Sequence, residues 1–164
     1  MLTPDKSYEY QMPTPQQSIP SSSLTSVPEY YADKNVFITG VTGFLGKATI
    51  EKLLRSCPKV KGVYCLIRPK KGQPVEERLK DVFKAQLFEK LRSEQPDFET
   101  KVHAIQGDVL EDGLGMSEEV KKSLVKIIHI IIHSAATIQI DDHIRMSAEM
   151  NSLGVSRMIH FAKA

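Results

Sequence analysis

The sequence predicts an α/β fold, a doubly wound parallel sheet of about four strands in the order 3-2-1-4. Three observations predict it. β-prone runs alternate with runs of helical periodicity, and a glycine-rich turn joins the first strand to the first helix. The fourth β-prone run is almost continuously isoleucine, which is typical of a parallel strand buried on both faces.

The first strand–helix–strand unit is expected from residue 35. Residues 35–40 are β-prone and end in glycine, and residues 62–69 form a second run rich in apolar residues. Between these strands, residues 44–57 carry apolar side chains at the spacing of one helix face, at Leu45, Ile50, Leu53 and Leu54.

The alternation continues to the last residue. The expected elements are helix 74–94, strand 101–109, helix 117–125, strand 126–136 and helix 143–164. Pro74 suits a first helical turn, and Ser117 followed by two glutamates suits a helix N-terminus. By contrast, residues 1–28 hold five of the nine prolines, six serines and no glycine. We therefore expect a disordered tail over 1–28 and a folded domain over 29–164.

The composition excludes several classes of protein. The 164 residues are 41% hydrophobic and 26% charged, and 22 basic against 20 acidic residues give a net charge of +2. That balance disfavours a nucleic-acid-binding protein. Cys57 and Cys65 are too few for a disulfide scaffold or a four-cysteine zinc site. Because no apolar run approaches about 18 residues and no apolar signal region opens the chain, we expect no membrane span and a cytosol-facing chain.

The glycine-rich turn is the sharpest functional signal. Gly40, Gly43 and Gly46 stand three residues apart, with Thr42 in the same loop. Gly40 suits a tight turn, Gly43 would let a pyrophosphate approach the backbone, and Gly46 would let the helix pack closely on the sheet. The N–H groups of the first helical turn would then bind phosphate. The alternative is a glycine-rich turn without a ligand.

Residues after the other strands extend this expected dinucleotide site. Arg68 ends the second strand with no acid nearby, which favours the 2′-phosphate of NADPH over the 2′-hydroxyl of NADH. Asp108 follows the third strand as an acceptor for adenine or as an ordinary turn acid. Ser134 and Ala135 are small enough to admit a nicotinamide ribose or a closely packed helix.

Two further pairs of residues lie near these strand ends. Lys70 and Lys71 either add to the basic group around Arg68 or occupy a solvated loop. His129 and His133 share one face of the expected fourth strand, but two ligands are too few for a metal site, so we expect no metal.

These residues resemble the extended short-chain dehydrogenase/reductase family, whose loop reads T-G-x-x-G-x-x-G, as residues 39–46 do here. More closely, residues 27–60, 66–79 and 131–141 are similar to the N-terminal NAD(P)-binding region of alcohol-forming fatty acyl-CoA reductases. The resemblance implies an incomplete Rossmann-type fold and the NADPH-dependent reduction of a long-chain fatty acyl-CoA to a primary alcohol. It also implies membrane association at the endoplasmic reticulum or peroxisome for the family.

The resemblance further implies which residues touch the cofactor. The residues implied at the pyrophosphate are Gly40, Thr42, Gly43, Phe44, Leu45 and Gly46. Arg68 is implied at the 2′-phosphate, Asp108 and Val109 near adenine, and Ser134 and Ala135 on the nicotinamide side.

Several positions depart from the family pattern. Gln139 stands where the family usually has arginine, and the family's catalytic Tyr-x-x-x-Lys lies on a helix after a fifth strand, beyond the printed residues. Tyr30 and Lys34 have this spacing, but they precede the first strand in a segment expected to be extended, so the pair is a coincidence. Asn151 resembles the asparagine of the N-x-x-G motif in extended reductases, or it is a helix residue bonded to water.

Three functions therefore remain open from the sequence. They are a fatty acyl-CoA reductase, a non-catalytic nucleotide-binding or interaction module, and another extended reductase such as a nucleotide-sugar epimerase. In each case the fourth strand is expected at a sheet edge without an acid or a proline, which predicts self-association of the isolated chain.

Overall fold

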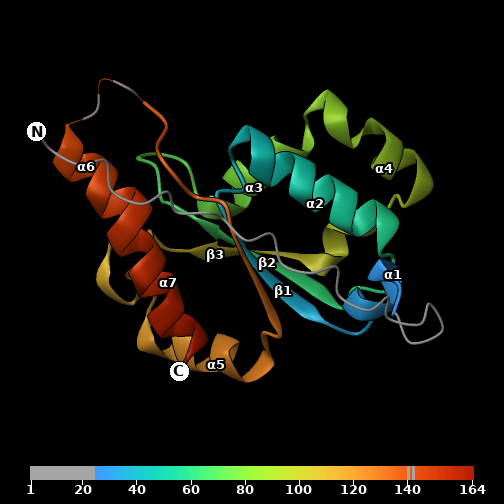
Figure 1. Ribbon diagram of the computed structural model, residues 1–164. Coiled ribbons are helices and arrows are strands. Elements are labelled where there is room, and N and C mark those ends of the chain that lie inside the picture. Colours follow the sequence, from blue (N-terminus) through green and yellow to red (C-terminus); the bar gives the residue numbers. More distant parts are fainter. Residues whose placement is uncertain (1–24, 140, 142) are drawn as a thin grey trace, which may run out of the picture.

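The computed structural model describes residues 25–139, 141 and 143–164, and it confirms the predicted fold class (Figure 1). The four strands of the sheet are β1 (Asn35–Thr39), β2 (Gly62–Ile67), β3 (Val102–Gln106) and β4 (Ile130–His133). Every neighbouring pair is parallel, and the order is β3-β2-β1-β4. The central strand β1 is therefore bordered by β2 on one side and β4 on the other.

Helices cover both faces of the sheet (Figure 1). The helices are α1 (Val27–Tyr31), α2 (Phe44–Ser56), α3 (Val75–Phe83), α4 (Glu89–Glu94), α5 (Glu118–Ile127), α6 (Ile144–Ala148) and α7 (Gly154–Ala162). Helices α2, α3 and α4 pack on one face, whereas α5 and α7 pack on the other. The strands alternate between the two layers, because Val36 and Ile38 join the first core while Phe37 contacts Phe161 of α7 in the second.

The expected helix 74–94 is broken into two, which corrects the sequence interpretation. Helix α3 ends at Phe83, and a 3₁₀ turn over Gln86–Phe88 leads into α4. On one continuous helix Phe83 and Phe88 would point about 140° apart. The break lets both rings enter one core, where each packs against Phe98.

The segment before β1 is also different from the expectation, because it is the helix α1 rather than extended chain. Ser26 and Glu29 form a capping box, in which the Ser26 N–H donates to Glu29 Oε2 at 2.9 Å. The S-x-x-E spacing is the sequence signal for this cap. Of the expected tail, residues 1–24 lie outside the described residues, and residues 27 and 28 open α1.

The strand β4 is shorter and less buried than expected. Residues 126 and 127 belong to α5, and all four strand residues are only partly buried. The expectation of complete burial was wrong, because β4 has a neighbouring strand on its β1 side alone within the part of the chain that the structure describes. No helix among the described residues is long and apolar enough to cross a membrane.

The free edge of β4 generates a first prediction. His129 donates its N–H to Asn35 of β1, so by the alternation of a parallel ladder the N–H groups of Ile130 and Ile132 point to the open edge. We expect two copies of the chain to pair through this edge as concentration rises. Hydrogen exchange followed by NMR should then show concentration-dependent protection of Ile130 and Ile132, with Ile131 protected throughout.

Light scattering on the same samples provides the control for this edge pairing. A particle of monomer mass at every concentration, with rapid exchange at both outward amides, would contradict the prediction. It would show that the open edge of β4 does not pair two copies of the chain.

Candidate functional site

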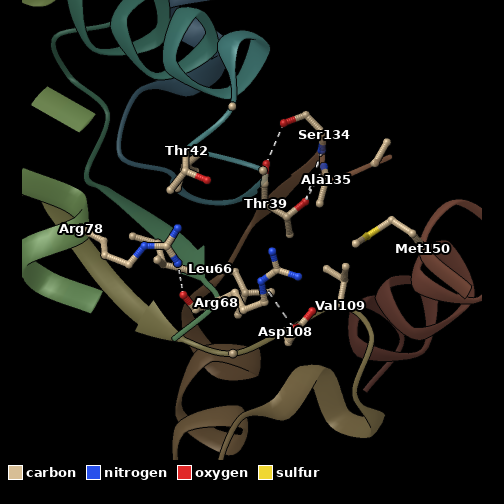
Figure 2. A pocket seen from close by; sticks show the side chains of 16 residues that line it. Thr39, Thr42, Leu66, Arg68, Arg78, Asp108, Val109, Ser134, Ala135 and Met150 are labelled. Atoms are coloured by element: carbon tan, nitrogen blue, oxygen red, sulfur yellow. Dashed lines mark hydrogen bonds and ion pairs between the residues drawn. The ribbon is translucent and has the colours of Figure 1, made fainter. Parts of the chain in front are cut away.

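A cleft lies where the carboxyl ends of the four strands meet (Figure 2). Its walls come from the ends of the strands and the segments that follow them, together with one residue of α3 and one of the helical segment before α7. The lining residues are 39–43 after β1, 66–68 at the end of β2, 107–109 after β3, 134–136 after β4, Arg78 and Met150. The cavity measures about 240 Å³, below the roughly 300–1,000 Å³ of complete small-molecule sites, so it fits part of a dinucleotide.

Two of the three loop glycines are required by the fold itself. Gly40 has a φ of +72°, and a Cβ there would come within 2.7 Å of the backbone of Ser134 and Ala135. A Cβ at Gly46 would collide with the carbonyl oxygen of Gly40 and lie 2.6 Å from Val41 Cα. Both glycines therefore allow β1, α2 and the end of β4 to pack against one another.

Gly43 has no such requirement. Its φ of −81° suits any residue, and within 4 Å an added Cβ would meet only the Gly40 carbonyl oxygen, at 3.3 Å. It is the N-cap of α2, and no side chain caps this helix. The backbone N–H groups at this terminus are thus accessible from the cleft for an anion.

The predicted loop residues separate into two groups in the structure. Gly40, Thr42 and Gly43 line the cleft, whereas Phe44, Leu45 and Gly46 form the first turn of α2 outside the lining. The Phe44 side chain is 89% exposed. Any contact of these three residues with a ligand in the cleft would therefore come from the backbone.

Thr39 joins the ends of β1 and β4, and sequence reasoning missed it. Its Oγ1 accepts the N–H groups of Ser134 and Ala135, each at 3.2 Å. The Ser134 hydroxyl donates in return to the Thr39 carbonyl at 2.7 Å. These bonds place the Ser134–Ala135 backbone directly against Gly40 (Figure 2). The sequence signal that could have pointed to Thr39 is a small polar residue directly before the first loop glycine.

The same hydroxyl determines the protonation of His133. Because two N–H groups occupy the lone pairs of Thr39 Oγ1, its proton points to His133 Nδ1, 2.7 Å away. His133 is then neutral and carries its proton on Nε2, a buried atom without a hydrogen-bond partner among the described residues. Burial lowers the pKa of this imidazole below its usual range, in agreement with a neutral ring.

Two guanidinium groups stand at the end of β2. Arg68, 62% exposed, lies with Nε 3.9 Å from Asp108 Oδ2, and Arg78 of α3 donates to the Arg68 carbonyl oxygen (Figure 2). Sequence reasoning missed Arg78, which lies one helical turn into α3 and meets the strand end only through folding. Lys70 and Lys71 are exposed and do not line the cleft, as the solvated-loop alternative expects.

Asp108 is held as a turn residue that still faces the cleft. Its Oδ1 accepts the N–H of Leu110 at 3.0 Å, while Oδ2 is directed toward Arg68. Val109 beside it is buried and lines the same wall. One oxygen of Asp108 therefore acts as the turn-acid alternative expects, and the other oxygen lies beside the Arg68 guanidinium.

Asn151 does not line the cleft, and its side chain is hydrogen-bonded to the backbone of Thr137. It lies in a π-helical segment, Glu149–Leu153, between α6 and α7 within the expected helix 143–164. Its Oδ1 accepts the Thr137 N–H and its Nδ2 donates to the Thr137 carbonyl, both at 2.9 Å. The side chain thus fixes the segment that follows β4, and the wider π turn brings it within reach. Among the described residues no cluster of metal-binding side chains occurs.

Comparison with known proteins identifies the family. The model of an NAD-binding family described as Male sterility protein matches residues 38–164. The chain belongs to the Male sterility protein family. The family is an NAD-binding one, which supports a nicotinamide cofactor for this chain.

Curated relatives of this Male sterility family member are named as fatty acyl-CoA reductases. The chain is 45% identical over 140 residues to fatty acyl-CoA reductase 1 of Gallus gallus and 44% identical to that of Homo sapiens. Each alignment covers 85% of this chain and 27% of the relative. The chain thus spans about a quarter of the length of the curated relatives that it matches.

Solved structures with the same fold are reductase domains. The terminal R domain of the myxalamid PKS-NRPS pathway has a TM-score of 0.66 and 26% identity, covering 80% of this chain and 32% of that one. The R domain of a non-ribosomal peptide synthetase from Mycobacterium tuberculosis has a TM-score of 0.64 and 25% identity, covering 79% and 30%. The fold is therefore the Rossmann-like fold of these reductase domains.

A pH dependence of stability is expected from His133. Its folded pKa is lowered, so the unfolded chain binds more protons below the unfolded value of about 6.5, and stability falls as pH decreases through that region. The slope attributable to one group is at most about 1.4 kcal/mol per pH unit. Denaturant unfolding at pH 7.5 and 5.5 should show this loss.

The variant His133→Gln should show a smaller loss, because Gln accepts the Thr39 hydroxyl without titrating. His103→Gln, at an exposed position on β3, is the matched control and should keep the full dependence. Equal pH dependence in the unmutated chain and in His133→Gln would contradict the neutral state assigned to this ring.

Proposed function

We propose that this chain is the cofactor-binding part of an NADPH-dependent reductase that converts a long-chain fatty acyl-CoA to a primary alcohol. The observation that carries the choice of cofactor is the pair of guanidinium groups, Arg68 and Arg78, at the ribose end of an open glycine-lined cleft. The names of the curated relatives support the reaction and the acyl-CoA substrate.

The residues present fit a bound NADPH. The uncapped N-terminus of α2 at Gly43 offers backbone donors to the pyrophosphate, and the absent Cβ leaves room for it. Arg68 and Arg78 offer planar donors to the 2′-phosphate, which suits arginine. In this proposal Asp108 and Val109, which line the cleft beside Arg68, flank the adenine. When bound, NADPH would supply the hydride for the reduction.

The charges at the Arg68 end of the cleft favour a 2′-phosphate over a free 2′-hydroxyl. A carboxylate that holds a 2′-hydroxyl would repel a 2′-phosphate, but the Asp108 carboxylate is already engaged by the Leu110 N–H. Its other oxygen is 3.9 Å from Arg68, a weak pairing that leaves the exposed guanidinium free to turn toward a dianion.

The wall formed by Ser134 and Ala135 suits the other end of the cofactor. Both residues present backbone and small side chains, and Thr39 fixes their N–H groups in the direction of β1. Asn151 fixes Thr137, two residues further along, from the π-helical segment. In this proposal Asn151 is a positioning residue for the nicotinamide side.

One observation favours a second candidate function, a nucleotide-binding module without catalysis. The residues that line the cleft include neither tyrosine nor lysine. Hydride delivery to a thioester or an aldehyde leaves an oxyanion that needs a proton donor. Tyr30 and Lys34 do not supply one, because Lys34 lies beyond the C-cap of α1 and neither residue reaches the cleft.

Cofactor choice is tested by titrating NADPH and NADH into the folded chain and following nicotinamide fluorescence. We expect tighter binding of NADPH. Arg68→Ala should weaken NADPH by about 1–2 kcal/mol, since the side chain is largely exposed, and should leave NADH almost unchanged. Equal affinity for both nucleotides in the unmutated chain would reject NADPH as the cofactor.

Gly43→Ala is the companion variant in this titration. Its added Cβ would lie 3.3 Å from the Gly40 carbonyl oxygen, a contact that needs only a small shift, and it enters the space assigned to the pyrophosphate. It should therefore weaken NADPH and NADH to the same extent, with at most a small fall in the melting temperature. Unchanged affinity for both nucleotides would place the pyrophosphate elsewhere.

The catalytic question is tested with NADPH and a long-chain acyl-CoA, followed by chromatography for fatty alcohol. We expect no alcohol from this chain alone, because the cleft lining holds no general acid of the tyrosine–lysine type. Alcohol formation that is lost in Tyr30→Phe would instead show that the Tyr30–Lys34 pair acts in catalysis.

A further inference from the structure

The segment that follows β3 has a strained backbone on the adenine side of the cleft. Gly113, Leu114 and Gly115 take φ values of 62°, 62° and 61° in succession. Leu114 is a branched residue in the left-handed region and is completely buried. Such a conformation persists only where the surrounding contacts hold it, so the question is which contacts hold this segment.

Helix α7 provides one such contact at its first residue. A Cβ at Gly154 would lie 3.6 Å from the Val109 carbonyl oxygen and 3.7 Å from Val109 Cβ. The backbone of α7 therefore packs closely against Val109, the buried residue that lines the cleft beside Asp108.

Arg157, three residues later on α7, provides the polar contacts. Its Nη1 donates to the Val109 carbonyl at 3.4 Å, and its Nη2 donates to Glu149 Oε2 at 3.2 Å. Its Nε reaches the exposed carboxylate of Asp112 at 3.4 Å. The side chain is only 20% exposed, so these contacts are partly shielded from water.

These acceptors come from two segments that meet at the cleft. Val109 is on the segment after β3, whereas Glu149 opens the π-helical segment that runs into α7 and directly precedes Met150, which lines the cleft beside Val109 (Figure 2). Arg157 is not among the lining residues itself. A planar guanidinium with several donors can hold two segments at once, which a single ammonium group cannot do equally.

We propose that Arg157 is a positioning residue that fixes Val109 and Met150 at the spacing required by the adenosine half of the cofactor. The proposal rests on the proposed function, because it assigns that half of the nucleotide to this end of the cleft. It adds a determinant of affinity that touches neither the cofactor nor the reacting atoms.

The test compares Arg157→Met with Arg92→Met in the full chain, each titrated by NMR with adenosine 2′,5′-bisphosphate and with nicotinamide mononucleotide. Arg92 is the matched control, because its Nη1 donates to the Phe83 carbonyl at 2.8 Å on the other face of the sheet. Arg157→Met should weaken the bisphosphate about tenfold, the scale of a hydrogen bond to a charged group, and leave the mononucleotide unchanged. Amide exchange at Val109 and Leu110 should accelerate in this variant alone.

Arg157→Lys should restore part of the affinity for the bisphosphate, since it retains one donor and the charge. The proposal is overturned if Arg157→Met and Arg92→Met bind the bisphosphate equally well, or if Arg157→Met weakens both probes in parallel. Failure of the unmutated chain to bind the bisphosphate and NADPH would instead overturn the proposed function, so the two failures are distinguishable.

Discussion

The candidate site depends on the hydrogen bonds of the Thr39 hydroxyl group. The hydroxyl accepts two backbone N–H groups from the end of β4 and donates to His133, and the Thr39 backbone carbonyl accepts from the Ser134 hydroxyl. β1 and β4 are the neighbouring strands between which the covering helices switch from one face of the sheet to the other. The Thr39 hydroxyl therefore aligns the two strand ends between which the cleft opens. Loss of the hydroxyl would leave two buried N–H groups and an imidazole to find other partners, at a cost that exceeds one ordinary hydrogen bond.

The glycines show how the requirements of folding and of binding are separated within a single loop. Gly40 and Gly46 are explained by close packing, because a side chain at either would overlap backbone atoms. Gly43 is not explained in this way, since its conformation is ordinary and its surroundings are almost open. A glycine that the fold does not need, placed at an uncapped helix N-terminus, is what a phosphate-binding role requires. The repeat of three glycines thus combines two positions that close packing requires with one that it does not.

Periodicity and turn chemistry were sufficient to predict the strands, most of the covering helices and the glycine loop, because those features are local in the sequence. The sheet order followed from the doubly wound class that this alternation indicates. The α1 helix was within reach too, since Ser26 and Glu29 carry the capping signal. The break after Phe83 was not, because it is decided by packing against Phe98. Thr39 and Arg157 were missed for the same reason, as their partners lie on strands and segments that only the tertiary fold brings near.

The distribution of charge along the cleft brings these observations together. The end of the cleft at β2 and β3 carries two guanidinium groups and an acid whose Oδ1 is engaged by a backbone N–H, and its floor is the positive end of the α2 dipole. The end near β4 is uncharged, because Ser134 and Ala135 have no ionisable group and the neighbouring His133 is held neutral by the Thr39 proton. A dinucleotide has the matching gradient, with its phosphates concentrated toward the adenosine half and an uncharged ring in the reduced nicotinamide half. The same hydroxyl that aligns the strands therefore also keeps a buried cation away from the β4 end of the cleft.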